Sequence, residues 1–151
     1  SIFSFYFFCF LLRFPAGFRF VHKSFSHKRK ELVKMPKIYF IDHGFLNQCT
    51  GNFGIDERQI GAYYENLVFS EFQKKDIDLK YWRTKSKAEL DFIRDDKIPI
   101  EVKKRPKVTR SLLSYIKKYQ PEQGYVVSEI EQERDERKGC QVNLVPFSKF
   151  I

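Results

Sequence analysis

Apolar and polar positions alternate along the chain with two different periods. A two-residue period is typical of strands that bury one face. The segments with this period are residues 18–20, 37–42, 77–84, 88–94 and 98–103. Two more short apolar segments, residues 124–129 and 141–146, have the character of strands in a buried sheet. The sequence thus predicts seven short strands.

A helical period occurs twice. Asp56 can cap a helix that continues to about Lys75, and Thr109 can cap one that ends near Tyr119. The apolar positions expected to face the core are Ile60, Tyr63, Tyr64, Leu67, Val68 and Phe72 in the first helix, and Leu112, Leu113, Ile116 and Tyr119 in the second. His43-Gly44 is expected to form a turn, and the charged run 129–139 a solvated helix or loop. The order from the first helix onward is helix, three strands, helix, strand, strand, which predicts an α/β fold with a mixed central sheet flanked by helices.

The strands at 88–94 and 98–103 should form a hairpin with an unusual charged face. A three-residue loop at 95–97 pairs Phe92 with Ile100 and Leu90 with Val102, which closes an apolar face. On the other face this register sets Asp91 opposite Glu101 and Glu89 opposite Lys103. Two opposed carboxylates repel and resist ionisation. A divalent cation would remove this penalty, and oxygen ligands favour Mg²⁺ or Mn²⁺.

Four segments in this order carry a family resemblance. Asp91 followed by Glu101-Val102-Lys103 resembles the D…(D/E)xK signature of the PD-(D/E)XK superfamily, although Leu90 stands where a proline often precedes the aspartate. Together, "KIYFIDHGFLN", "GAYYENLVFSEF", "YWRTKSKAELDFI" and "IPIEVKKR" resemble the C-terminal domain of unknown function in archaeal and bacterial AAA-type P-loop ATPases. The resemblance covers roughly residues 18 to 151, with residues 1–17 interpreted as an aromatic remnant of a preceding region.

This resemblance implies a restriction-endonuclease-like αβββαβ core and Mg²⁺- or Mn²⁺-dependent hydrolysis of phosphodiesters. Asp91, Glu101 and the Val102 carbonyl would be metal ligands, and Lys103 would stabilise the transition state beside the phosphate. Glu65 would order water or a second metal, and Glu89 would support Lys103. The sequence has no GxxxxGK[ST] motif, so ATP would bind only to a P-loop module in cis, upstream of this chain.

Composition and charge predict the class of binding partner and the cellular compartment. The net charge of +9 favours polyanions, and we expect nucleic acid, with DNA preferred, as the partner. The candidate phosphate contacts are Lys28, Arg29, Lys30, Lys104, Arg105 and Lys107. The apolar stretch from Phe5 to Leu12 is too short to span a bilayer as a helix, and three widely spaced cysteines favour a reducing cytoplasm.

Two alternatives to an active nuclease stay open. The domain could bind nucleic acid without cutting it, through the basic clusters. It could also be a docking or regulatory domain for the ATPase module. The first alternative predicts salt-sensitive binding that survives removal of Asp91; the second predicts self-association or poor solubility of the isolated domain.

Overall fold

The computed structural model describes residues 18–21, 36–51, 54, 57, 59–130, 135–137 and 139–150. The predicted segment 1–17 and the candidate phosphate contacts Lys28, Arg29 and Lys30 lie outside these residues. Among the described helices, none is both long and apolar enough to cross a membrane.

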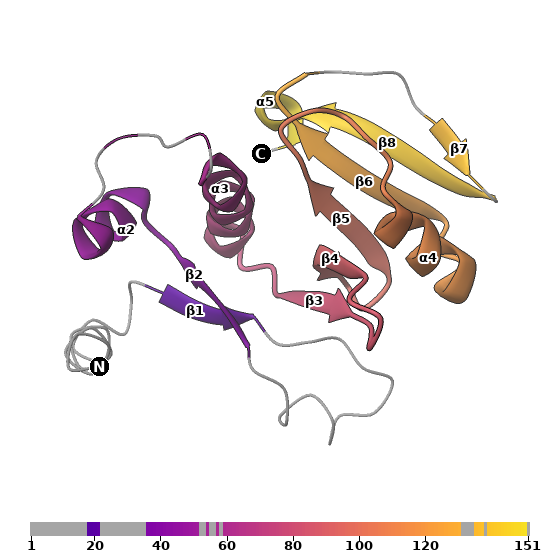
Figure 1. Ribbon diagram of the computed structural model, residues 1–151, viewed down its shortest axis with the longest axis horizontal. Coiled ribbons are helices and arrows are strands. Elements are labelled where there is room, and N and C mark those ends of the chain that lie inside the picture. Colours follow the sequence, from indigo (N-terminus) through magenta and orange to yellow (C-terminus); the bar gives the residue numbers. More distant parts are fainter. Residues whose placement is uncertain are drawn as a thin grey trace.

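A mixed sheet of six strands forms the centre of the molecule (Figure 1). In spatial order the strands are β3 (Leu79–Arg83), β4 (Glu89–Arg94), β5 (Ile98–Val102), β6 (Gln123–Ser128), β8 (Cys140–Pro146) and β7 (Asp135–Arg137). Strands β5, β6 and β8 are parallel, while β3–β4–β5 and β7–β8 pair antiparallel. The predicted α/β class with a mixed central sheet is confirmed.

Helices cover both faces of this sheet and bury two apolar cores. Helix α3 (Ile60–Lys74) packs Val68, Phe69 and Phe72 into one core, and helix α4 (Arg110–Tyr119) packs Leu112, Tyr115 and Ile116 into the other. The short helix α5 (Phe147–Phe150) joins the α3 side through Phe150. The buried residues of the sheet therefore face either the α3 core or the α4 core.

Strands β1 (Phe18–Val21) and β2 (Lys37–Phe40) form a separate antiparallel ribbon against α3. Tyr39 stacks on Phe69 with ring centroids 4.9 Å apart. The side chain of Asn66 clamps the main chain of Phe40: its Oδ1 accepts from the Phe40 N–H at 2.7 Å, and its Nδ2 donates to the Phe40 carbonyl at 2.9 Å. The ribbon is thus attached to α3 by stacking and by a two-bond amide clamp.

A bulge in β4 separates Leu90 from Phe92. Lys80 pairs with Ile93 and Trp82 pairs with Leu90, so Asp91 and Phe92 of β4 oppose only Tyr81 of β3. The extra residue turns Phe92 into the α3 core and Leu90 into the α4 core. The predicted pairing of Phe92 with Ile100 is confirmed, but the prediction that Leu90 shares their apolar face is wrong.

Several element boundaries also differ from prediction. Helix α3 begins at Ile60 with Gln59 as its N-cap, while Asp56 lies outside the described residues. The expected turn at His43 is the start of helix α2 (His43–Thr50), where Asp42 accepts a hydrogen bond from the Phe45 N–H at 2.7 Å. Within the charged run, β7 forms an edge strand rather than a helix or loop.

Helix α4 begins and ends as predicted. Its N-cap is Thr109, whose Oγ1 accepts a hydrogen bond from the Leu112 N–H at 3.2 Å. On its buried face Tyr115 takes the place expected for Tyr119, which is 43% exposed. Trp82 lies against this face, in edge-to-face contact with Tyr115, and its Nε1 donates to the Tyr119 hydroxyl at 3.2 Å. Trp82 is therefore a packing residue.

Candidate functional site

Asp91 lies in the first half of β4, beside the end of β5. The backbone pairing of β4 with β5 extends to Phe92 and Ile100; beyond this pair, the Val102 N–H donates to Oδ2 of Asp91 at 2.8 Å. The aspartate side chain thus takes a backbone donor of the neighbouring strand. The bulge that opposes Asp91 and Phe92 to one residue of β3 allows this position. Asp91 is buried, with 7% of its surface exposed.

Glu101 is held at the start of α4. Both of its carboxylate oxygens accept from the Thr109 hydroxyl, at 2.8 and 2.6 Å, and Thr109 is also the cap of that helix. The residue is 2% exposed. Burial raises the pKa of Glu101 above its usual value, although Thr109 and Lys103 oppose the shift. One threonine therefore positions both a helix terminus and a buried acid.

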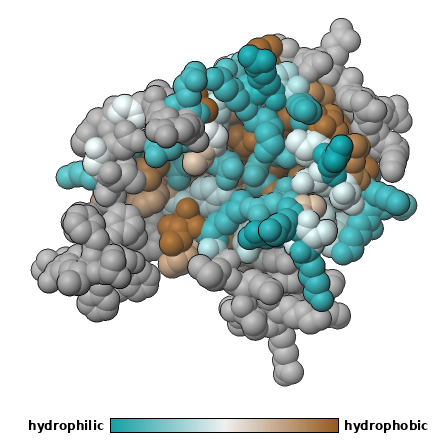
Figure 2. Space-filling view, viewed as in Figure 1, coloured by the Kyte–Doolittle hydropathy of each residue, from teal (hydrophilic) through white to brown (hydrophobic). Residues whose placement is uncertain are grey.

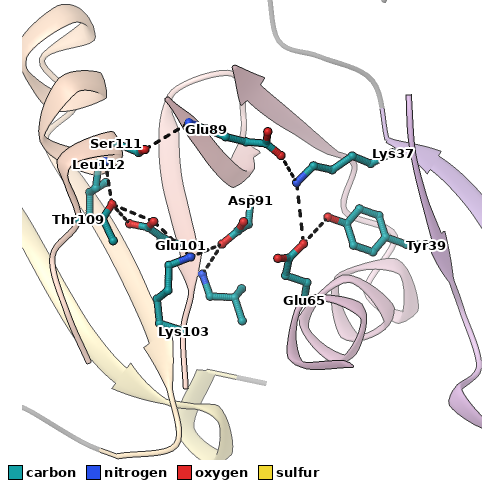
Figure 3. A network of polar contacts seen from close by, with 11 residues as sticks. Lys37, Tyr39, Glu65, Glu89, Asp91, Glu101, Lys103, Thr109, Ser111 and Leu112 are labelled. Atoms are coloured by element: carbon teal, nitrogen blue, oxygen red, sulfur yellow. Dashed lines mark hydrogen bonds and ion pairs between the residues drawn. The ribbon is translucent and has the colours of Figure 1, made fainter. Parts of the chain in front are cut away.

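Lys103 connects the two acids (Figure 3). Its Nζ lies 3.4 Å from Oδ2 of Asp91 and 3.3 Å from Oε1 of Glu101. Burial acts to lower the pKa of Lys103, but the two carboxylates outweigh it and the net pKa is raised. The ammonium group is therefore charged at neutral pH and compensates two buried carboxylates.

Glu65 approaches from α3 on the other side of Asp91 (Figure 3). Its Oε2 accepts from the Tyr39 hydroxyl at 2.9 Å and lies 3.8 Å from the Nζ of Lys37. Burial, and then the charge of Asp91, raise the pKa of Glu65. The structure thus brings together all four acidic and basic side chains predicted for catalysis, from α3, from β4, and from the end of β5 and the residue after it.

Glu89 has partners other than the predicted one. It pairs with Lys37 at 2.6 Å and with Arg83 at 3.2 Å, whereas Lys103 turns to Asp91 and Glu101. The predicted support of Lys103 by Glu89 is therefore wrong. The cause is again the bulge, which breaks the simple alternation between positions 89 and 91.

Two site residues, Lys37 and Tyr39, were missed by sequence reasoning. The alternation of "KIYF" places them on one face of β2, and that face meets Glu65 and Glu89. The signal was present as a period of two. What the sequence did not provide was the position of β2 against α3, because that contact joins residues far apart along the chain.

The donor set suits a hard divalent cation. Asp91, Glu101 and Glu65 offer carboxylate oxygens, and Asp91 and Glu101 are buried. Burial raises the pKa of Glu65 and of Glu101, and a bound cation would oppose this rise because it favours the ionised carboxylate. Among the described residues, however, no three His, Cys, Asp or Glu side chains converge closely enough to form a ready metal site. Lys103 lies between Asp91 and Glu101, so metal binding would require its ammonium group to move aside. The role of the Val102 carbonyl stays a prediction.

Three of the predicted phosphate contacts lie within four residues after Lys103. Lys104, Arg105 and Lys107 are exposed in the segment between β5 and α4, and Lys104 lies 3.7 Å from Glu57. Figure 2 shows hydrophilic side chains over much of this view of the molecule, with hydrophobic ones visible between them. The others, Lys28, Arg29 and Lys30, lie outside the described residues.

Comparison with known proteins identifies a family but no individual relative. The model of a "Domain of unknown function (DUF4143)" matches residues 60–150, a range that contains Glu65, Asp91, Glu101 and Lys103. No curated protein and no solved structure matched the chain. The matched range covers more than half of the chain, which therefore belongs to the DUF4143 family.

Proposed function

We propose that this domain hydrolyses phosphodiester bonds in nucleic acid with the help of Mg²⁺ or Mn²⁺. The observation that carries the proposal is that Asp91 and Glu101, which are both buried, each form an ion pair with the ammonium group of Lys103. Burying two acids and a base together costs free energy, and such clusters of ionisable groups occur preferentially at functional sites. The order helix, three strands, helix, strand supports the further proposal of a restriction-endonuclease-like, PD-(D/E)XK core.

Each residue would have a distinct role. Asp91 and Glu101 would hold the cation, which when bound supplies the charge that polarises a phosphate and acidifies a water. Lys103 would exchange its carboxylate partners for the phosphate and offset charge that develops there. Glu65, oriented by Tyr39, would accept a hydrogen bond from a water in the site. The exposed cations Lys104, Arg105 and Lys107 would contact the backbone of the substrate, for which we favour DNA.

The wider setting is part of the proposal. The DUF4143 family is commonly found in the C-terminal regions of AAA-type ATPases. We therefore propose a P-loop ATPase module in cis and a cytoplasmic protein. ATP would act only through that module.

A second candidate is a domain that binds nucleic acid, or docks on the ATPase module, without cutting. Two observations favour it: Lys103 already compensates both acids, and no three ligating side chains converge among the residues described. In that case the acids and Lys103 would be a structural ion network.

Cleavage by isosteric variants separates the two candidates. A plasmid and a single-stranded oligonucleotide are incubated with Mn²⁺ and the full chain, or with Asp91→Asn or Glu101→Gln, which keep hydrogen-bond acceptors for Val102 and Thr109. Glu122→Gln is the matched control, because this side chain is 88% exposed. We expect metal-dependent cutting by the parent and the control and at least a hundredfold loss in the two site variants.

Metal binding is read independently of activity. Mn²⁺ should raise the unfolding temperature of the parent and of Glu122→Gln but not of the site variants. A folded parent that neither cuts nor gains stability with Mn²⁺ would refute the nuclease proposal and favour the binding or docking domain.

A further inference from the structure

A cavity of about 550 Å³ opens beside Glu65, between β2, α2 and the first turns of α3. Its volume is within the range of about 300–1,000 Å³ that is typical of small-molecule sites. The lining is mostly apolar, with Ile38, Leu46 and Tyr63 among its walls, and it includes Lys37 and Glu65. These last two residues belong to the polar network that contains Asp91 and Glu89 (Figure 3). The cavity and the acidic site are therefore adjacent.

The open edge of β2 lines this cavity. In an antiparallel pair, residues alternate between those that bond across the ladder and those whose N–H and C=O point away from it. Phe40 points both groups away from β1, because both bond the Asn66 side chain. Ile38, two residues earlier, directs its N–H and C=O to the same side. Among the described residues, none outside the ribbon forms a hydrogen bond with the main chain of Ile38.

Within β2, the groups that this edge presents to a ligand are the N–H and the C=O of Ile38. Asn66 occupies the next pair of groups along the strand, at Phe40, so a peptide could not add a full strand here. A flat heteroaromatic ring with a donor beside an acceptor needs only the pair at Ile38. The surface that such a ring would contact is apolar, because the side chains of Ile38 and Tyr63 line it. Both side chains can be reached by a ligand, since Ile38 is 46% exposed and Tyr63 is half-buried.

We propose that this cavity receives one unstacked nucleobase of a single-stranded substrate. The base would bond the main chain of Ile38, and its sugar-phosphate would pass Lys37 toward Lys103. The inference deepens the proposed function and rests on it for the place of the phosphate; base binding itself can be measured without cleavage. It names the substrate as single-stranded or locally opened nucleic acid, because a base inside a duplex cannot enter a cavity.

The test compares an intact oligonucleotide with an abasic one. Fluorescein-labelled single strands of equal length, one with all its bases and one with none, are titrated with the full chain by fluorescence anisotropy. Ca²⁺ replaces Mg²⁺ to slow cleavage. We expect the intact strand to bind about tenfold more tightly, which corresponds to about 1.4 kcal/mol. Equal affinity for the two strands would overturn the proposal.

Cavity variants locate the base. Ala62→Trp fills the cavity from the exposed side of α3, and Gly61→Trp adds the same ring next to it, at a position outside the lining. Ile38→Pro removes the cavity-facing N–H but no bond of the ribbon. We expect Ala62→Trp to abolish the preference for the intact strand, Ile38→Pro to reduce it about threefold, and Gly61→Trp to leave it unchanged. A preference retained in both cavity variants would overturn the proposal.

The two proposals can fail separately. Metal-dependent cutting without a base preference would overturn only the base cavity. A base preference that is lost in Ala62→Trp, in a protein that never cuts, would support the cavity and count against phosphodiester hydrolysis.

Discussion

The Val102 N–H donates a hydrogen bond to Oδ2 of Asp91 at 2.8 Å, just beyond the last backbone pair of the β4–β5 hairpin. A charged side chain thus replaces a backbone carbonyl as the partner of a strand N–H. The same oxygen lies 3.4 Å from Nζ of Lys103. Asp91 therefore has a structural role in the hairpin as well as its proposed role in chemistry, and the two roles need different variants.

The structural role predicts a loss of stability in Asp91→Ala. The variant leaves the Val102 N–H and the Lys103 ammonium without this partner, and an unsatisfied buried group costs about 1–3 kcal/mol. We expect the free energy of unfolding, measured with urea, to fall by that amount. Asp91→Asn should lose less, because its amide oxygen can still accept from Val102. Asp78→Ala, at an exposed aspartate, is the control and should change stability by less than about 0.5 kcal/mol. Equal stability of Asp91→Ala and Asp78→Ala would contradict the role assigned to this bond.

The hairpin also shows what the sequence could and could not predict. Its register followed from apolar alternation and loop length, since only one register pairs Phe92 with Ile100 without mixing faces. The bulge could not be predicted, because it depends on how β4 pairs with β3 and not on β4 alone. It redirected Leu90 and gave Glu89 different partners.

Other failures have local or long-range causes. Helix α2 is short and caps itself through Asp42, so its few turns produced little periodic signal. Strand β7 lies at the edge of the sheet, where charged residues discourage further pairing, and its charged sequence has no apolar alternation that would predict a strand. The contact of Lys37 and Tyr39 with Glu65 depends on the packing of a separate ribbon, which no local pattern specifies.

Thr109 should be more sensitive to alanine than to serine. Its hydroxyl caps α4 and also donates to Glu101, so Thr109→Ala loses both bonds and should cost about 1–2 kcal/mol in the free energy of unfolding. Thr109→Ser keeps the hydroxyl and should restore most of this loss. Urea unfolding followed by the emission of Trp82, the chain's only tryptophan, reports directly on the packing of α4. A serine variant as unstable as the alanine variant would show that the methyl group, not the hydroxyl, is what matters.

Glu101 should make stability depend on pH in a specific direction. Its pKa is raised in the folded protein by burial, so the folded state binds the proton more tightly than the unfolded state does. Protonation therefore stabilises the fold, and this contribution is gained as pH falls from neutral through the raised pKa toward the usual value of 4.5.

Glu101→Gln isolates this contribution. The amide can still accept from Thr109 but does not titrate. The free energy of unfolding of the variant should therefore exceed that of the parent most near neutral pH, and this difference should shrink as pH falls toward 4.5. Free energies of unfolding of both proteins are measured across this interval, and the difference removes titrations that they share. A difference that stays constant with pH would contradict a raised pKa for Glu101.

Asn66 should control the attachment of the β1–β2 ribbon, and with it the position of Glu65. Asn66→Ala removes both bonds to the Phe40 main chain in a buried setting, which should cost about 2 kcal/mol or more. Because the ribbon carries Tyr39, which orients Glu65, loosening of the ribbon should also disturb the position of Glu65 in the site.

Hydrogen exchange measures the loosening directly: the amide of Tyr39 should exchange faster in Asn66→Ala, while the amides of β6 in the central sheet keep their protection. Gln73→Ala is the matched control, since Gln73 is also an α3 amide that bonds a backbone carbonyl, that of Ile77, on the opposite end of the helix. Uniform acceleration across ribbon and sheet would mean that the ribbon unfolds only with the whole domain, and the clamp would then not be a separate device.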